Sequence, residues 1–174
     1  MAPEPGNERF SAARRLFRGF VPSARPAFYR LHWITTDIAV AAAPGRADWP
    51  AIEAQGVRAV LDLRAEVDQV APKLGLAFRH LPIVEGGAPA VEVLQEAATW
   101  VVSRIHDTGP VLIHCREGRG RSPMVACSAL IALGYSAADA YDLLRRGQPG
   151  VAMSESQVAA IEALALPKDH SGGS

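Results

Sequence analysis

The fold is decided by one segment, which reads Val111-Leu112-Ile113-His114-Cys115-Arg116-Glu117-Gly118-Arg119-Gly120-Arg121-Ser122-Pro123. Its first three residues are apolar and follow the helix-breaking pair Gly109-Pro110, which predicts a short buried strand. The pair Ser122-Pro123 favours the start of a helix, with serine as the N-cap and proline at the first helical position. The segment therefore predicts a strand, a glycine-bearing loop and a helix in direct succession.

The loop between this strand and this helix has the features of an anion site. Gly118 and Gly120 can adopt positive φ, which lets successive backbone N–H groups turn toward one point. The start of the following helix adds partial positive charge. Arg121 lies six positions after Cys115, and its planar guanidinium can grip two phosphoryl oxygens. We therefore expect the substrate phosphate to be bound by Arg116, Glu117, Gly118, Arg119, Gly120 and Arg121.

A cysteine at the end of the strand would lie beneath these donors. The N–H groups, the helix dipole and the arginine would stabilise the thiolate of Cys115, which could attack phosphorus and form a phosphocysteine intermediate. Ser122 would donate a hydrogen bond to the sulfur when it leaves, and His114 would position the loop through hydrogen bonds. The nucleotide-binding pattern G-x-x-x-x-G-K-[ST] is absent, and no second His/Cys cluster is present to complete a zinc site.

The loop resembles the H-C-x-x-G-x-x-R-[ST] signature of the protein tyrosine phosphatase superfamily in His114, Cys115, Gly118, Arg121 and Ser122. Further likeness to the dual-specificity branch lies in Val60–Glu66, Gly134–Ala140 and Gln157. Low-molecular-weight tyrosine phosphatases carry the same loop near their N-terminus, whereas here it lies two-thirds along the chain. The resemblance implies a phosphoric monoester hydrolase of the dual-specificity type that needs no metal or cofactor.

The family also places an aspartate, the general acid, about thirty residues before the cysteine. In this chain that position falls in the loop at residues 81–89, which contains no aspartate. Glu85 is its one carboxylate, and we assign it as proton donor to the leaving oxygen and then as base for the hydrolytic water. The alternative is that Glu85 is a solvated loop residue without a catalytic role.

The remaining sequence predicts an α/β fold with a central, mostly parallel sheet of four to five strands flanked by helices. Strands are expected at residues 30–34, 38–40, 57–63, 77–81 and 111–113, and helices at 48–55, 91–106, 122–134, 136–146 and 154–166. We divide the chain into a basic N-terminal arm (1–28), which carries one short amphipathic helix near residues 10–20, a phosphatase domain (29–166) and a flexible C-terminal tail (167–174).

Composition narrows the class of protein. The chain has 174 residues, 49% hydrophobic and 21% charged, as expected of a soluble globular domain. Its two cysteines are too few for a disulfide framework, which favours a reducing compartment, and we expect a cytoplasmic protein. Cys127 falls on the apolar side of the helix after the loop and is expected in the core.

Charge is spread unevenly along the chain although its total is zero. Residues 1–30 hold six arginines against two glutamates, a net charge of +4. Such an arm could make peripheral contact with an anionic membrane, or it could be a solvated leader that packs loosely on the domain. No nucleic-acid partner is expected.

Two arginines inside the loop help to indicate which class of substrate the site could bind. Arg116 and Arg119 lie where inositol-lipid phosphatases of the resembled superfamily carry basic residues, and extra cations suit a polyanionic head group. Glu117 between them offsets part of this charge. We therefore rank phosphotyrosine or phosphoserine/threonine proteins first and phosphoinositide or phosphatidylglycerol phosphate second. A phosphate-binding pseudophosphatase is the non-enzymatic alternative.

Asp62 and Arg64, at the end of a predicted strand, would either orient the loop or form a local ion pair.

Overall fold

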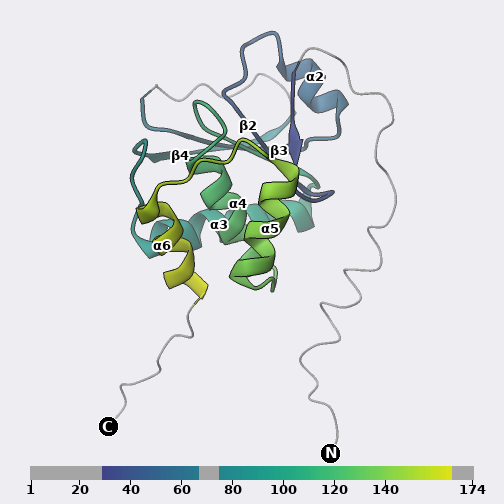
Figure 1. Ribbon diagram of the computed structural model, residues 1–174. Coiled ribbons are helices and arrows are strands. Elements are labelled where there is room, and N and C mark those ends of the chain that lie inside the picture. Colours follow the sequence, from purple (N-terminus) through teal and green to yellow (C-terminus); the bar gives the residue numbers. More distant parts are fainter. Residues whose placement is uncertain (1–28, 67–74, 166–174) are drawn as a thin grey trace, which may run out of the picture.

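The computed structural model describes residues 29–66 and 75–165. At its centre is a five-stranded sheet with the strand order β1-β2-β5-β3-β4 (Figure 1). The short β1 (His32–Trp33) pairs antiparallel with β2 (Ile38–Ala41). The remaining strands run parallel to β2: β5 (Val111–His114), β3 (Ala59–Arg64) and β4 (Ala77–Ile83). The predicted mostly parallel sheet is confirmed, and each expected strand is present within a few residues.

Helices cover both faces of the sheet, as Figure 1 shows. The short α2 (Trp49–Ala54) lies on one face. The opposite face carries α3 (Val91–Asp107), α4 (Arg121–Ala132), α5 (Ala137–Gly147) and α6 (Glu155–Ala165). The five helices expected between residues 48 and 166 are therefore all present.

Each central strand supplies side chains to two separate cores. Residues toward α2 include Ala39, Val60 and Leu112, which pack with Ile52. Their neighbours in sequence point to the helical layer on the other side, among them Val40, Leu61 and Ile113. Successive residues of a strand point to opposite faces, so a strand covered on both sides must be apolar throughout. This requirement explains the nearly continuous apolar run that predicts β3.

The central helix α4 begins two residues earlier than the predicted cap at Ser122 implies. Its N-cap is Gly120 rather than Ser122, and its first internal hydrogen bond runs from Met124 N to Gly120 O. Pro123 therefore occupies the third helical position instead of the first. This is tolerated because the first N–H groups of a helix have no partner within the helix. The shift places Arg121 and Ser122 in the first turn, against the loop that carries Cys115.

Several expectations concern residues that the structure does not describe. The basic arm at 1–28, its short helix near 10–20 and the tail at 167–174 lie outside the described residues, and the division into three parts stays a prediction.

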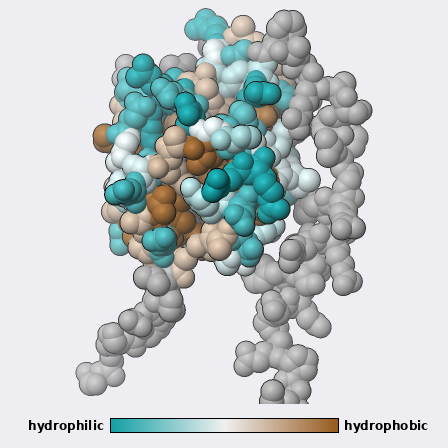
Figure 2. All heavy atoms as spheres, viewed as in Figure 1, coloured by the Kyte–Doolittle hydropathy of each residue, from teal (hydrophilic) through white to brown (hydrophobic). Residues whose placement is uncertain are grey.

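Among the described helices, none combines the length and the apolar character that crossing a bilayer requires. On the face seen in Figure 2, hydrophobic side chains form small spots among hydrophilic ones.

Candidate active site

Cys115 follows β5 at the carboxyl edge of the parallel sheet and is almost completely buried. Its Sγ accepts a hydrogen bond from Gly118 N at 3.2 Å and lies 3.4 Å from Ser122 Oγ. The sulfur thus sits inside the turn of residues 115–121, which we call the anion loop, with the first turn of α4 above it. The structure brings together Cys115, Ser122 and the loop backbone as the sequence predicts.

The backbone of the anion loop is held by outward hydrogen bonds. The carbonyls of Arg116, Gly118 and Arg119 accept from Ala43 N at 3.1 Å, Gln148 Nε2 at 3.2 Å and Ala152 N at 2.8 Å. In a planar trans peptide the carbonyl and the following N–H point in opposite directions. The N–H groups of Glu117, Arg119 and Gly120 therefore face away from these partners and toward the centre of the loop. This arrangement suits an anion.

Gly118 is the residue that makes the loop possible. Its φ is +72°, and a Cβ built there would lie 2.4 Å from the backbone carbon of Ala41. Only glycine satisfies both the backbone conformation and the close approach to β2.

Arg121 is buried, with its side chain only 2% exposed, and its guanidinium is fixed by hydrogen bonds to Glu66, Ile83 and Leu63. Nη1 and Nη2 donate to the two carboxylate oxygens of Glu66 at 2.7 and 2.9 Å, and Nη1 also donates to Ile83 O at 3.0 Å. The hydrogen bonds from Arg121 lower the pKa of Glu66 to about 2, and in turn they raise the pKa of Arg121. The arginine is held in one orientation before any substrate arrives.

Glu85 lies on a tight turn at residues 84–87, which we call the acid turn. Gly87 N donates to Val84 O at 3.3 Å, and Gly86 has a φ of +75°, the conformation that such turns need at their third position. The Glu85 carboxylate is exposed and lies between two guanidiniums, with Oε2 at 4.0 Å from Arg121 Nη2 and 3.9 Å from Arg116 Nη1. The one carboxylate of the loop at residues 81–89 is thus beside the anion loop.

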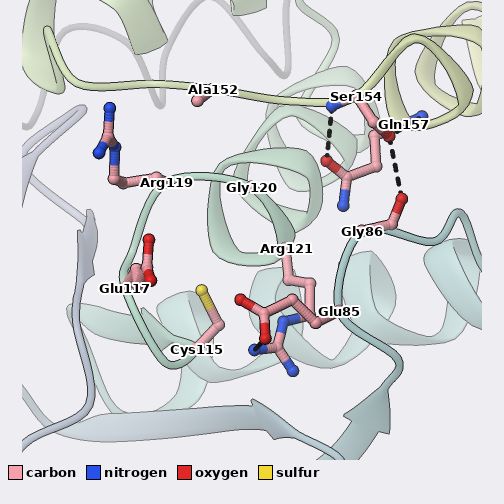
Figure 3. Close-up of a pocket in the computed structure, with 10 residues that line it drawn as sticks. All are labelled: Glu85, Gly86, Cys115, Glu117, Arg119, Gly120, Arg121, Ala152, Ser154 and Gln157. Carbon is pink, nitrogen blue, oxygen red and sulfur yellow. Dashed lines mark hydrogen bonds and ion pairs between the residues drawn. The ribbon is translucent and has the colours of Figure 1, made fainter.

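A hollow of about 320 Å³ opens above the sulfur (Figure 3). Its lining comes from the acid turn, the anion loop and the segment before α6, namely Glu85, Gly86, Cys115, Glu117, Arg119, Gly120, Arg121, Ala152, Ser154 and Gln157. Of the expected phosphate-binding side chains, Arg116 is not among the lining residues and is 66% exposed. Arg119 lines the hollow, but its Nε donates to Gly150 O at 2.8 Å.

A buried polar group supports the anion loop from behind. Asp62, which pairs in register with His114, receives hydrogen bonds from Arg64 Nε and Nη2 at 3.0 and 2.8 Å. Burial raises the pKa of Asp62, but the hydrogen bonds from Arg64 and the charges of His114 and Arg64 together lower it, and the net shift is downward. Asp62 and Arg64 thus form a local ion pair. Because this pair lies directly beside His114, the residue before Cys115, the other hypothesis, that Asp62 and Arg64 orient the loop, also has a basis.

His114 does not make the hydrogen bonds that the sequence predicts. Neither ring nitrogen has a hydrogen-bond partner within the described residues, and its nearest charged neighbour is Asp62 Oδ1 at 3.7 Å. The ring instead packs edge-on against Trp49, with centroids 6.2 Å apart. Burial lowers the pKa of His114 to about 4, despite the opposing effect of Asp62. The imidazole is therefore a neutral packing element behind the loop at neutral pH.

One more sequence expectation, and one site residue that the sequence does not predict, can be compared with the structure. Cys127 lies in the core on α4, where burial raises the pKa of its thiol to about 12, as expected of a structural cysteine. The sequence does not predict Glu66 as a site residue, although it is the second residue after β3, the strand beside β5. Carboxyl ends of neighbouring parallel strands meet at one edge of a sheet, and this rule is the signal that could have found it.

Solved structures share this architecture. Tk-PTP in its active form superposes with a TM-score of 0.70 and 29% identity, over 78% of this chain and 95% of that one. PTPMT1 in complex with PI(5)P gives 0.70 and 18%, over 78% and 94%, and human DUSP28 gives 0.68 and 17%, over 78% and 95%. No curated protein sequence matches the chain. The sheet, the helical layers and the cysteine loop define a cysteine-based phosphatase of the dual-specificity type.

The match of the sequence to a family is more specific. Residues 37–135 match the family described as polymorphic toxin system, DSP-PTPase phosphatase, and the chain belongs to that family. The matched region contains β2 through α4, and with them both the acid turn and the anion loop.

Proposed function

We propose that this phosphatase hydrolyses phosphate monoesters through a phosphocysteine intermediate on Cys115, and that its substrates are phosphotyrosine or phosphoserine/threonine proteins. The observation that carries the proposal is the position of Cys115 Sγ, 3.2 Å from Gly118 N and 3.4 Å from Ser122 Oγ inside the anion loop. A sulfur atom enclosed by donors at the bottom of an open hollow supports a role as the nucleophile that attacks a bound phosphoryl group.

In the first step the Cys115 sulfur forms a bond to phosphorus while the bond from phosphorus to the ester oxygen breaks. Arg121 and the inward N–H groups of the loop stabilise the charge on the three remaining phosphoryl oxygens. Glu85 gives its proton to the leaving oxygen. The alcohol or phenol departs, and phosphocysteine remains.

In the second step water attacks the phosphocysteine, and the sulfur leaves with the electron pair of the S–P bond. The Glu85 carboxylate takes the proton from the attacking water, which returns this residue to its starting state. Ser122 donates a hydrogen bond from its hydroxyl group to the departing thiolate and keeps its proton. Phosphate is released, and the two steps together convert the ester and one water molecule into an alcohol or phenol and phosphate.

The charges around the hollow support a substrate with a single phosphate. Arg116 and Arg119 are the extra cations, but Arg116 lies beside Glu85 and Arg119 is bonded to Gly150 O. Two carboxylates, Glu85 and Glu117, line the hollow as well. A head group with several phosphates would meet these carboxylates, whereas one phosphate on a tyrosine, serine or threonine side chain would not require further cations.

A phosphoinositide or another phospholipid is the second candidate. PTPMT1, which shares the fold, has been crystallised with PI(5)P. Among the described residues, the exposed Arg116 beside Glu85 could contact a lipid head group. Rates on matched phosphopeptides and phosphorylated lipids would decide between the two classes. Faster turnover of the lipids would favour the second.

The chemical proposal is tested with p-nitrophenyl phosphate in the presence of a chelator. Wild type should turn over, Cys115→Ser should be inactive, and Glu85→Gln should be slower by about 10²–10⁴. Equal activity of all three proteins would exclude the mechanism. An inactive wild type that still binds phosphate analogues would identify a pseudophosphatase instead.

A further inference from the structure

The segment that connects α5 to α6 lies between the anion loop and the acid turn. On one side it contacts the anion loop through Gln148 Nε2, Gly150 O and Ala152 N, at 3.2, 2.8 and 2.8 Å from their partners. On the other side it reaches the acid turn where α6 begins (Figure 3). One short segment thus touches both the nucleophile's loop and the turn that carries Glu85.

The start of α6 is closed by a reciprocal cap. Ser154 Oγ accepts from Gln157 N at 3.3 Å, and Gln157 Oε1 accepts from Ser154 N at 3.0 Å. This is the capping box, for which serine followed three positions later by glutamine is a suitable pair. Both acceptors are used to end the helix, and a glutamate at the second position would serve equally well.

The same two side chains have donors that the cap does not need, and both reach the acid turn. Ser154 Oγ donates to Gly86 O at 3.1 Å, and Gln157 Nε2 donates to Gly87 O at 3.3 Å. Gln157 is 2% exposed, and its Oε1 lies 3.2 Å from where a Cβ on Gly120 would be. The amide therefore fits between the acid turn and the anion loop, with little room to change conformation.

These contacts bear directly on Glu85. The two bonded carbonyls belong to the residues that immediately follow it, on an exposed turn closed by a single internal hydrogen bond from Gly87 N to Val84 O. Small displacements of a catalytic group have large effects on rate. We propose that Ser154 and Gln157 are positioning residues, whose hydrogen bonds to Gly86 O and Gly87 O hold Glu85 over the phosphoryl site for proton transfer. This inference rests on the proposed role of Glu85.

The test separates the cap from the contact with the acid turn. Gln157→Glu keeps an N3 acceptor for the capping box but removes the donor to Gly87 O. Ser154→Gly removes the donor to Gly86 O with little loss of cap stability. Ser136→Gly is the matched control, because Ser136 is the N-cap of α5, accepts from Asp139 N and is exposed. Thermal unfolding of each variant verifies that the fold is retained.

The readout is the ratio of kcat/KM for two aryl phosphates. Phenyl phosphate has a poor leaving group that needs a proton, whereas 2,4-dinitrophenyl phosphate has a leaving group that does not. Added charge near the phosphate acts on both substrates alike and cancels in the ratio. We expect Gln157→Glu and Ser154→Gly each to lose about tenfold on phenyl phosphate and much less on the dinitrophenyl ester. Ser136→Gly should leave the ratio unchanged.

Combination with Glu85→Gln completes the test. Once the acid is absent its position no longer matters, so adding Gln157→Glu to Glu85→Gln should give no further change in the ratio of kcat/KM for the two substrates. Equal losses on both substrates in the single variants, or a further change of the ratio in the double variant, would overturn the positioning role while leaving Glu85 as the acid. An unchanged ratio in Glu85→Gln alone would overturn the acid assignment and this inference together.

Discussion

The guanidinium of Arg121 and the carboxylate of Glu66 form a two-point ion pair, with Nη1 at 2.7 Å from Oε2 and Nη2 at 2.9 Å from Oε1. The two residues belong to different elements of the fold. Arg121 lies in the first turn of α4, and Glu66 lies two residues after β3. The pair fixes the plane of the guanidinium. An arginine that is already oriented loses less conformational freedom when it binds a phosphoryl group.

Replacement of Glu66 by glutamine is expected to weaken catalysis without unfolding the protein. A neutral amide cannot accept both charge-assisted hydrogen bonds, so the orientation of Arg121 becomes less defined. We expect kcat/KM on p-nitrophenyl phosphate to fall about 10–100-fold. Glu96→Gln is the control, since Glu96 pairs with Arg79 away from the site. Unchanged kcat/KM in Glu66→Gln would show that Arg121 needs no anchor.

Replacement of Gly118 by alanine is expected to destroy the anion loop. The added Cβ would meet the backbone of Ala41 at 2.4 Å, in a residue whose φ is +72°. We expect a loss of unfolding free energy of more than ~1 kcal/mol and a decrease in kcat of at least about 100-fold. Urea unfolding and steady-state kinetics measure the two effects.

Gly134→Ala provides the comparison for this prediction. Gly134 also has a positive φ, +94°, but nothing lies within 4 Å of the position of its Cβ. Its replacement should cost about 1 kcal/mol through backbone strain and leave kcat unchanged. Similar kinetic losses in both variants would mean that the close approach to Ala41 has no role.

The buried, neutral His114 is expected to make the fold sensitive to acid. Burial lowers the pKa of this imidazole from 6.5 to about 4, so between these values the unfolded chain binds a proton that the folded protein does not. Stability from this residue is complete above pH 6.5 and declines as the pH falls toward 4. The expected loss at pH 4.5 is on the order of 2–3 kcal/mol. Urea unfolding at pH 7 and pH 4.5 should show it in wild type and much less of it in His114→Asn. An equal loss in both would assign the acid sensitivity to other groups.

The fold follows closely from local sequence patterns. Val57–Leu63 is apolar except for Arg58 and Asp62 because β3 is covered on both faces. The period of the apolar residues from Val91 onward matches the buried side of α3. The start of α4 was misplaced because Ser122-Pro123 is a strong local signal for a helix start, whereas the tertiary contacts of the loop begin the helix at Arg121.

The site was only partly predictable for a different reason. Cys115, Arg121 and Ser122 lie within one short segment, so their spacing alone indicates their association. Glu66 and Ser154 reach the site from parts of the chain far from it in sequence, and their partners are defined only by the packing of β3 and α6. The capping pattern at Ser154 and Gln157 predicts a helix start, but it does not indicate that the same side chains contact the acid turn.

The central claim is that phosphate passes through the Cys115 sulfur. The most direct measurement is rapid quenching of the reaction with an aryl phosphate, followed by mass spectrometry of the protein and of the peptide that contains Cys115. Wild type should carry one phosphoryl group on Cys115 during turnover, and Cys115→Ser should carry none at this position and release no product. Turnover by Cys115→Ser, or turnover by wild type with no phosphoryl group on Cys115 at any time after mixing, would contradict the account.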